Sequence, residues 1–314
     1  MDLFITTFEA VAVLLAIGLI GFLIIKQKIV PGRILSLISP LALDIALPSL
    51  VFVDIILDFT PEKYPNWWQL PLFWAFFTVI AFVLTFLFMF ISKKETRREF
   101  AVTLFYQNGI FFPLAILSSM FPGDQTYIIS LFLFTIFYPA FFFTTYQFFF
   151  NRGDKLKIDY KKIFHPVLIV TLIGITIGII GINDLVPDIV VSVFSLLGAM
   201  TIPLLMIILG GNIYVDYKKQ GSFDFIEVSK FVLIKNIIFP LVFIGILILI
   251  KSYITNVVAI IILLQAAVPP VTAVPLVTER SGGNRSIVNQ FMVASFIVSL
   301  ISIPLMIGIF DRLF

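Results

Sequence analysis

Long apolar runs, separated by short polar segments, make up most of the chain. Ten runs approach or exceed the roughly 20 apolar residues that a helix needs to cross a bilayer. They cover residues 4–25, 34–57, 69–91, 99–121, 126–150, 163–182, 188–212, 228–250, 254–279 and 286–310. The pattern therefore predicts an all-α polytopic membrane protein with ten transmembrane helices.

Prolines interrupt two of these runs near their middle. The ninth contains Gln265-Ala266-Ala267-Val268-Pro269-Pro270-Val271-Thr272-Ala273-Val274-Pro275, and the fourth contains Gln107-Asn108-Gly109-Ile110-Phe111-Phe112-Pro113. Each proline lacks an N–H and clashes with the preceding helical turn, so we predict that both helices stop and restart. Irregular backbone at bilayer depth is tolerated only where it is buried in protein or lines a wet cavity. Two matching breaks point to the binding site of a secondary transporter.

Basic residues occupy alternate connections between the runs. The connections after runs one, three, five, seven and nine carry seventeen Lys and Arg, whereas the opposite side carries three: Lys63, Lys251 and Arg312. Because Lys and Arg accumulate in cytoplasmic loops, we expect both termini outside an integral protein of the cell membrane.

Weak internal similarity suggests a duplication. Pro48 in run two aligns with Pro203 in run seven, and Pro113 in run four aligns with Pro275 in run nine. We predict a first five-helix repeat over 1–150, a cytoplasmic connecting loop over 151–162 and a second repeat over 163–314. An odd number of helices in each repeat makes the second copy inverted, an arrangement that supports alternating access.

The amino-acid composition supports a membrane protein and argues against several other classes of protein. The chain is 60% hydrophobic and only 12% charged, against about 25% charge in a soluble protein. The net charge of +3 is spread between apolar runs, so no nucleic-acid partner is expected. The absence of cysteine excludes disulfides and thiol catalysis. No metal site and no cofactor are expected.

Three motifs resemble the auxin efflux carrier family of membrane transport proteins, part of the wider bile acid/sodium symporter-like superfamily. The motifs are Ala46-Leu47-Pro48-Ser49-Leu50-Val51-Phe52, Asn108-Gly109 through Pro113-Leu114, and Ala266-Ala267-Val268-Pro269-Pro270 followed by Thr278-Glu279-Arg280-Ser281-Gly282-Gly283. The similarity covers essentially the whole chain, without the long central loop of the plant exporters. It implies inverted repeats whose broken helices four and nine cross at mid-membrane. It also implies a scaffold of helices one, two, six and seven, a moving domain of the others, and a homodimer.

The predicted crossover supplies the candidate substrate-binding residues. Broken half-helices direct free N–H groups and positive dipole ends inward, which suits a carboxylate. We therefore expect a small organic anion, such as a carboxylate or an auxin-like acid, to bind here and to move by elevator-type alternating access. The candidates are Gln107, Asn108, Gly109, Pro113, Gln265, Pro269, Pro270, Thr272 and Pro275.

Three further residues are candidates for coupling or gating. Asp44 lies near the centre of run two, where an ionised carboxylate is costly, so it is expected to face the bundle interior. Lys235 lies one or two turns inside run eight and either snorkels to the headgroups or contacts the anion or Asp44. Asn236 beside it is either a ligand or a helix-packing hydrogen bond.

Three alternatives remain beside the anion carrier. A cation-coupled symporter of the bile-acid type would bind Na⁺ or H⁺, but no acidic cluster lies beside the predicted crossover. An intramembrane enzyme would need a catalytic motif such as Gly-x-Ser-x-Gly or His-Glu-x-x-His, and the chain has none. A passive channel would need more polar residues in mid-span than the chain provides.

Overall fold

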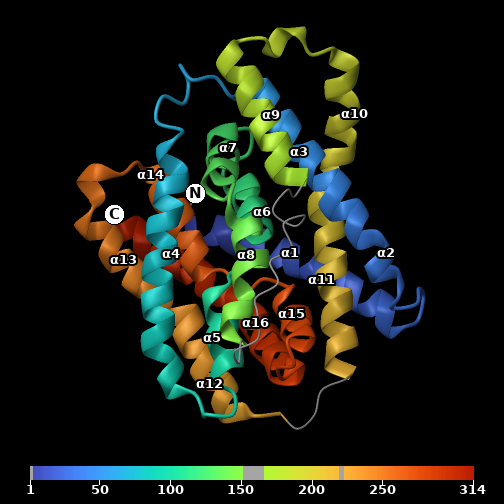
Figure 1. Cartoon of the computed structure of the whole chain (residues 1–314), viewed down its shortest axis with the longest axis vertical. Helices are drawn as coiled ribbons and strands as arrows, with labels where there is room; N and C mark the ends of the chain where they lie inside the picture. Colours follow the sequence, from blue (N-terminus) through green and yellow to red (C-terminus); the bar gives the residue numbers. More distant parts are fainter. Residues whose placement is uncertain (1–2, 151–165, 219–222) are drawn as a thin grey trace.

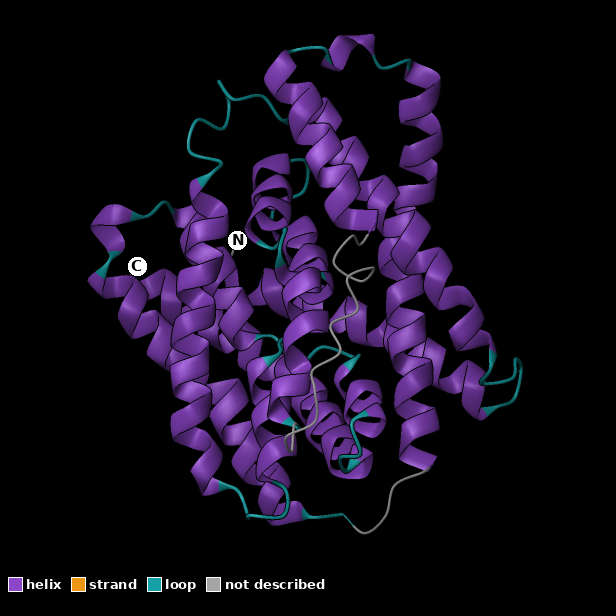
Figure 2. Ribbon diagram, in the orientation of Figure 1, coloured by secondary structure: helices purple, strands orange, loops and turns teal. Residues whose placement is uncertain are grey.

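A computed structural model describes residues 3–150, 166–218 and 223–314. In these ranges the backbone is helical, apart from short loops and one isolated backbone bridge (Figure 2). The predicted connecting loop over 151–162 lies outside the described residues, as do the first three residues of the predicted second repeat. The all-α prediction is confirmed.

The helices of the first half match the predicted runs, with several interruptions. They are α1 (Leu3–Lys26), α2 (Ile34–Pro40), η1 (Leu41–Ala46), α3 (Leu47–Asp58), α4 (Gln69–Phe88), η2 (Met89–Ile91), α5 (Arg97–Phe105), α6 (Phe111–Met120), α7 (Gln125–Phe134), α8 (Tyr138–Thr145) and η3 (Tyr146–Phe149). The fifth run is predicted as one helix, but a turn at 135–137 interrupts it. Pro139 explains the restart, because proline fits the first turn of a helix, where its missing N–H is not needed.

The second half repeats this alternation of long and interrupted helices. It contains α9 (Pro166–Ile180), η5 (Asn183–Leu185), α10 (Asp188–Ala199), α11 (Thr201–Lys218), α12 (Phe225–Leu233), η6 (Ile234–Ile238), α13 (Phe239–Leu249), η7 (Lys251–Tyr253), α14 (Asn256–Ala267), α15 (Val274–Arg280) and α16 (Arg285–Leu313).

Seven helical stretches of the described chain are long and apolar enough to cross a membrane. They correspond to predicted runs one, two, three, five, seven, eight and ten. The other three runs contain the shorter apolar helices α6, α9 and α14. Two of these are shortened by the breaks at 106–110 and 268–273. The count of ten spans therefore stays a prediction.

Two groups of helices can be followed in Figure 1. One contains α3 packed against α9 and α10, and α1 packed against α11. The other contains α4, α5 and α12 to α16, with α6, α7 and α8 between the groups in this view. Gly210 allows the α1–α11 contact, since a Cβ there would lie 1.7 Å from the Gly18 carbonyl oxygen. Backbone-to-backbone approach through small residues is typical of membrane helix pairs.

Two π-helical segments precede prolines inside long helices. η1 is followed by Pro48 and η6 by Pro240. Proline clashes with the carbonyl four residues before it, and a wider turn relieves that clash. In η1, Leu43 lies toward a cavity described below, while Asp44 is exposed. The prediction that Asp44 faces the bundle interior is wrong, because Leu43 occupies the face turned toward the cavity and Asp44 points to the outside of the bundle.

Candidate substrate site at two paired helix breaks

The two interrupted segments, residues 106–110 and 268–273, lie against each other and are called the paired breaks below. An antiparallel bridge joins Gln107 to Pro270. The Asn108 N–H donates to the Pro269 carbonyl at 2.8 Å, and the Val271 N–H donates to the Tyr106 carbonyl at 3.0 Å. Each segment therefore satisfies backbone groups that the other leaves without a helical partner.

Two glutamine side chains connect the paired breaks further. Gln107 Nε2 donates to Gln265 Oε1 at 3.1 Å, and Gln265 Nε2 donates to the Gly109 carbonyl at 2.6 Å. Both side chains are buried. Gly109 leaves room for this contact, because a Cβ there would lie 2.3 Å from Gln265 Oε1 and the amide would have to move. The side-chain amides of the two glutamines therefore hold the two interrupted segments together.

Two further side chains donate hydrogen bonds to carbonyl groups that the breaks leave without a helical partner. The Tyr138 hydroxyl donates to the Gln107 carbonyl. Lys235 Nζ donates to the Ala266 carbonyl at 3.2 Å, at the C-terminal end of α14. A cation suits this place, since the C-terminal end of a helix carries partial negative charge. The Lys235 side chain is 1% exposed, so the snorkelling alternative is wrong, and so is a pair with the exposed Asp44.

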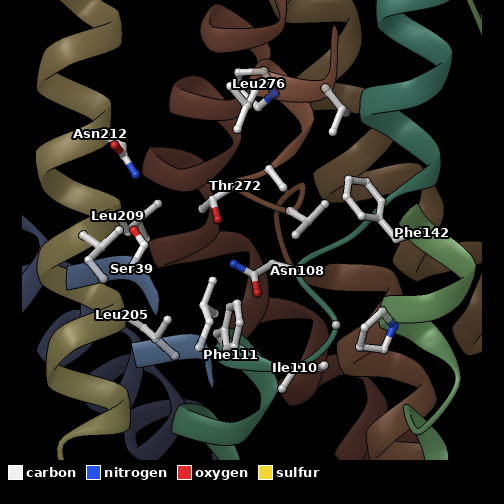
Figure 3. Close-up of a pocket in the computed structure, with 18 of the residues that line it drawn as sticks. Ser39, Asn108, Ile110, Phe111, Phe142, Leu205, Leu209, Asn212, Thr272 and Leu276 are labelled. Atoms are coloured by element: carbon white, nitrogen blue, oxygen red, sulfur yellow. The ribbon is translucent and has the colours of Figure 1, made fainter. Parts of the chain in front are cut away.

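A cavity of about 420 Å³ adjoins the paired breaks (Figure 3). Its walls come from α2, η1, α3, α8, η3, α9, α11, α15 and α16, and from the segments 108–111 and 271–273. The lining is mostly apolar, as is usual for small-molecule sites. Its polar side chains are few: Ser39, Asn108, Tyr138, Tyr146, Asn212, Thr272, Arg280 and Arg285.

Asn108 is a buried polar residue of the cavity wall whose side-chain oxygen is left unsatisfied. Its side chain is 1% exposed, and its Oδ1 has no hydrogen-bond partner. Figure 3 shows the Asn108 amide in the cavity, with the hydroxyl of Thr272 directed toward it. An unpaired buried polar group costs about 1–3 kcal/mol, so a ligand that donates a hydrogen bond to this oxygen gains that energy.

Positive groups flank the cavity on two sides. Helix α6 begins at Phe111 without a side-chain cap, so its first N–H groups are available near Asn108. At the other side lie Arg280, which is exposed, and Arg285, which is paired with Glu279. The cavity thus combines an apolar body with hydrogen-bond donors and nearby cations, a combination suited to an amphipathic anion.

The predicted site residues fall into three sets. Asn108, Gly109, Thr272 and Pro275 line the cavity. Gln107, Gln265, Pro269 and Pro270 form the paired breaks behind it, and Pro113 is buried in α6. Asn236 is used in packing: its Nδ2 donates to the Ser295 carbonyl at 3.1 Å, and its Oδ1 accepts from Ser295 Oγ at 2.8 Å.

Sequence reasoning did not assign Tyr138, Arg280 or Arg285 to the site. A Tyr-Pro pair at the start of α8 is the only sequence signal for the first. The two arginines are counted in the sequence among loop charges, and only the folded chain shows that they border the cavity.

The fold and the site define a class: a helical integral membrane protein with an internal cavity beside interrupted helices. A family model described as "Membrane transport protein" matches residues 6–307. The chain belongs to this family, which is the auxin efflux carrier family, and the predicted resemblance is confirmed. The comparison with curated proteins gave no match.

Proposed function

We propose that this protein is a secondary transporter for a small organic anion, held by its carboxylate at the paired breaks. The observation that carries the proposal is the Asn108 amide, which is buried in the wall of a 420 Å³ cavity and whose Oδ1 has no hydrogen-bond partner. A carboxylate would accept from the Asn108 Nδ2 and from the N–H groups that open α6. A hydroxyl or N–H group elsewhere on the substrate would donate to the unpaired Asn108 Oδ1. The apolar walls would hold the rest of the substrate.

In this proposal the chain forms ten spans in two inverted repeats, with broken helices four and nine crossing at mid-membrane. The helix pairs α1–α11 and α3 with α9 and α10 support a scaffold, which meets the other helices where α1 packs against α16 and α6. The remaining helices would carry the anion past that scaffold by elevator-type alternating access. The basic loops place the end of the molecule with Arg280 in the cytoplasm. Both termini then lie outside the cell membrane.

Lys235 is proposed as the coupling or gating residue among the predicted candidates. Its ammonium group lies on the carbonyls at the end of α14, directly behind the paired breaks. The hydrogen bond that it donates there stabilises the interrupted backbone, and in its charged form the lysine would contribute to the potential felt by an anion in the cavity. Asp44 is exposed and Asn236 is fully used in packing, so neither is proposed for this role.

Flux in proteoliposomes tests the proposal. A panel of radiolabelled acetate, malate, benzoate and indole-3-acetate is offered to the wild type, to Asn108→Ala and to Asn66→Ala. The control removes an exposed amide outside the cavity. We expect Asn108→Ala to lower flux of the best substrate at least about tenfold, the effect of losing about 1.4 kcal/mol. Equal flux in Asn108→Ala and Asn66→Ala would contradict the proposal that the paired breaks form the binding site.

The homodimer implied by the family resemblance stays a prediction. Mass photometry of the protein in lipid nanodiscs would measure it directly. A single peak at the mass of one chain plus its disc would contradict it.

A further inference from the structure

A second cavity of about 150 Å³ lies between α3, α10 and α11 on one side and α6 and α7 on the other. It is separate from the cavity at the paired breaks and contains no residue of 106–110 or 268–273. Asp124, in the turn before α7, is part of its lining, so this cavity lies toward the end of the molecule opposite to Arg280. Below, the cavity at the paired breaks is the inner cavity and this one is the outer cavity.

The two cavities share their walls. Along α2, η1 and α3, Ser39, Leu43 and Leu47 line the inner cavity, and the same face continues with Leu50 and Asp54 in the outer one. Steps of three and four residues keep all five on one helix face. Along α10 and α11, Gly198 and Ile202 line the outer cavity, and Leu205, Leu209 and Asn212 line the inner one. The cavities therefore lie end to end in one groove.

When the two halves of the sequence are aligned, residues that line one cavity align with residues that line the other. With Pro48 aligned to Pro203, Leu47 aligns with Ile202, Leu50 with Leu205, and Asp54 with Leu209. With Pro113 aligned to Pro275, Leu114 aligns with Leu276, and Ser118 with Arg280. In every one of these pairs, one residue lines the inner cavity and its counterpart lines the outer cavity. An inverted repeat produces this relationship, because its two halves are related by an axis in the membrane plane. That axis places equivalent residues of the two halves toward opposite sides of the membrane.

Charge breaks the symmetry between the cavities. The inner cavity has Arg280 where the outer one has Ser118, and the outer cavity has Asp54 where the inner one has Leu209. Asp54 is half-buried, and within the described residues its carboxylate makes no hydrogen bond or ion pair. Asp58, one turn further along α3, is paired with Lys63 and Tyr64. Asp54 therefore directs an uncompensated acidic group into the groove.

We infer that the outer cavity is the outward half of the substrate path, narrowed in this conformation, and that Asp54 is a specificity-determining residue that weakens anion binding from outside. The inference rests on the proposed function, because it needs an anion to travel the groove. Like charges repel strongly in a cavity with low-dielectric walls. An anion that enters from the cytoplasmic side would meet Arg280 first and Asp54 last, so it binds more tightly from inside than from outside.

Cysteine labelling tests the path without depending on any substrate. The chain contains no cysteine, so single cysteines can be introduced directly. Ser118→Cys is expected to react with a membrane-impermeant maleimide applied outside, and Leu276→Cys with the same reagent applied inside. Ser299→Cys, buried on α16 away from both cavities, is the matched unreactive control. Labelling of Ser118→Cys from inside, or from neither side, would overturn the assignment of the outer cavity.

Oriented proteoliposomes test the role of Asp54. The substrate is whichever of acetate, malate, benzoate and indole-3-acetate gives the highest wild-type flux, with an alkaline outer buffer to keep carboxylates ionised. Asp54→Asn is expected to lower the outside KM about tenfold, as one charge at close range predicts, and to leave the inside KM within about twofold. Glu62→Gln removes an exposed outer charge away from the groove and should change neither. An unchanged outside KM, or an equal fall in both, would overturn the inference.

The two tests separate the claims. If no acid of the panel is transported but Ser118→Cys and Leu276→Cys react from opposite sides, the anion proposal fails and the path stands. If flux depends on Asn108 while the labelling is reversed, the proposed function stands and the outer cavity is not part of the path.

Discussion

Gln107 and Gln265, separated by 158 positions in the sequence, are joined side chain to side chain at 3.1 Å where two broken helices meet. The same Gln265 amide continues to the Gly109 carbonyl at 2.6 Å. These bonds fix the relative position of two short segments that have little regular structure of their own. They also leave Asn108, one residue from Gln107, free to face the cavity.

Gly109→Ala is expected to break this connection. The new Cβ would lie 2.3 Å from Gln265 Oε1, so the amide must move and both glutamine hydrogen bonds are lost. Loss of buried hydrogen bonds costs about 1–3 kcal/mol, which should appear as a lower melting temperature in detergent and a loss of flux. Gly245→Ala is the control, because a Cβ there meets no atom within 4 Å. Equal melting temperatures for the two variants would contradict the prediction.

Lys235→Met should separate stability from transport. Replacing a buried charge by an apolar side chain of similar length is often neutral or stabilising, so the melting temperature is expected to hold or rise. Flux should nevertheless fall by at least about tenfold, because the carbonyls ending α14 lose their cation. Lys235→Arg keeps the charge and should retain more flux than Lys235→Met. Full flux in Lys235→Met would exclude a coupling or gating role.

Gly210→Val should disrupt the contact between α1 and α11. A Cβ at Gly210 would lie 1.7 Å from the Gly18 carbonyl oxygen, and backbone cannot move aside as a side-chain end can. Overpacking of this kind costs about 1–3 kcal/mol or more, so lower yield and a lower melting temperature are expected. Size-exclusion chromatography with a thermal ramp measures both. A variant that behaves like the wild type would show that the two helices do not approach so closely.

The ion pair between Lys93 and Asp224 predicts a pH dependence of stability. The bond from Lys93 Nζ, at 2.6 Å, lowers the pKa of Asp224, and the same bond raises the pKa of Lys93. A carboxyl with a depressed folded pKa stabilises above its ordinary pKa, and this contribution is lost as pH falls through the lower folded value. The lysine contribution is lost only as pH rises through its raised value.

Asp224→Asn tests this dependence while keeping the helix cap. Asp224 caps α12 by accepting from the Glu227 N–H, and asparagine can accept the same bond. The variant should melt slightly below the wild type at neutral pH, and the difference should vanish in acid and in high salt. Glu62→Gln removes a carboxylate for which the described residues show no ion pair, and serves as control. A difference that persists in acid would assign the effect to something other than the carboxylate charge.

The sequence determined the class of this protein and the places where its helices break. Apolar runs of bilayer length, with few charges, cannot be accommodated in water. The Pro269-Pro270 pair, with Pro275 after it, and Pro113 after Asn108-Gly109 indicate where two helices stop and restart, whereas the isolated Pro304 lies within α16. These are local constraints, so they can be read residue by residue.

Only the tertiary structure decided which polar groups are free. In the sequence, Gln107, Asn108 and Gln265 are all amide residues within apolar runs, and nothing distinguishes their roles. In the structure, the two glutamines hold the paired breaks together, and the Asn108 side chain is left for a ligand. Asp44 is exposed on a π-helical segment, and Lys235 donates to a carbonyl at the C-terminal end of α14, which comes from a distant part of the chain. Hydrogen bonding between residues far apart depends on how helices pack, and packing is set by the whole chain at once.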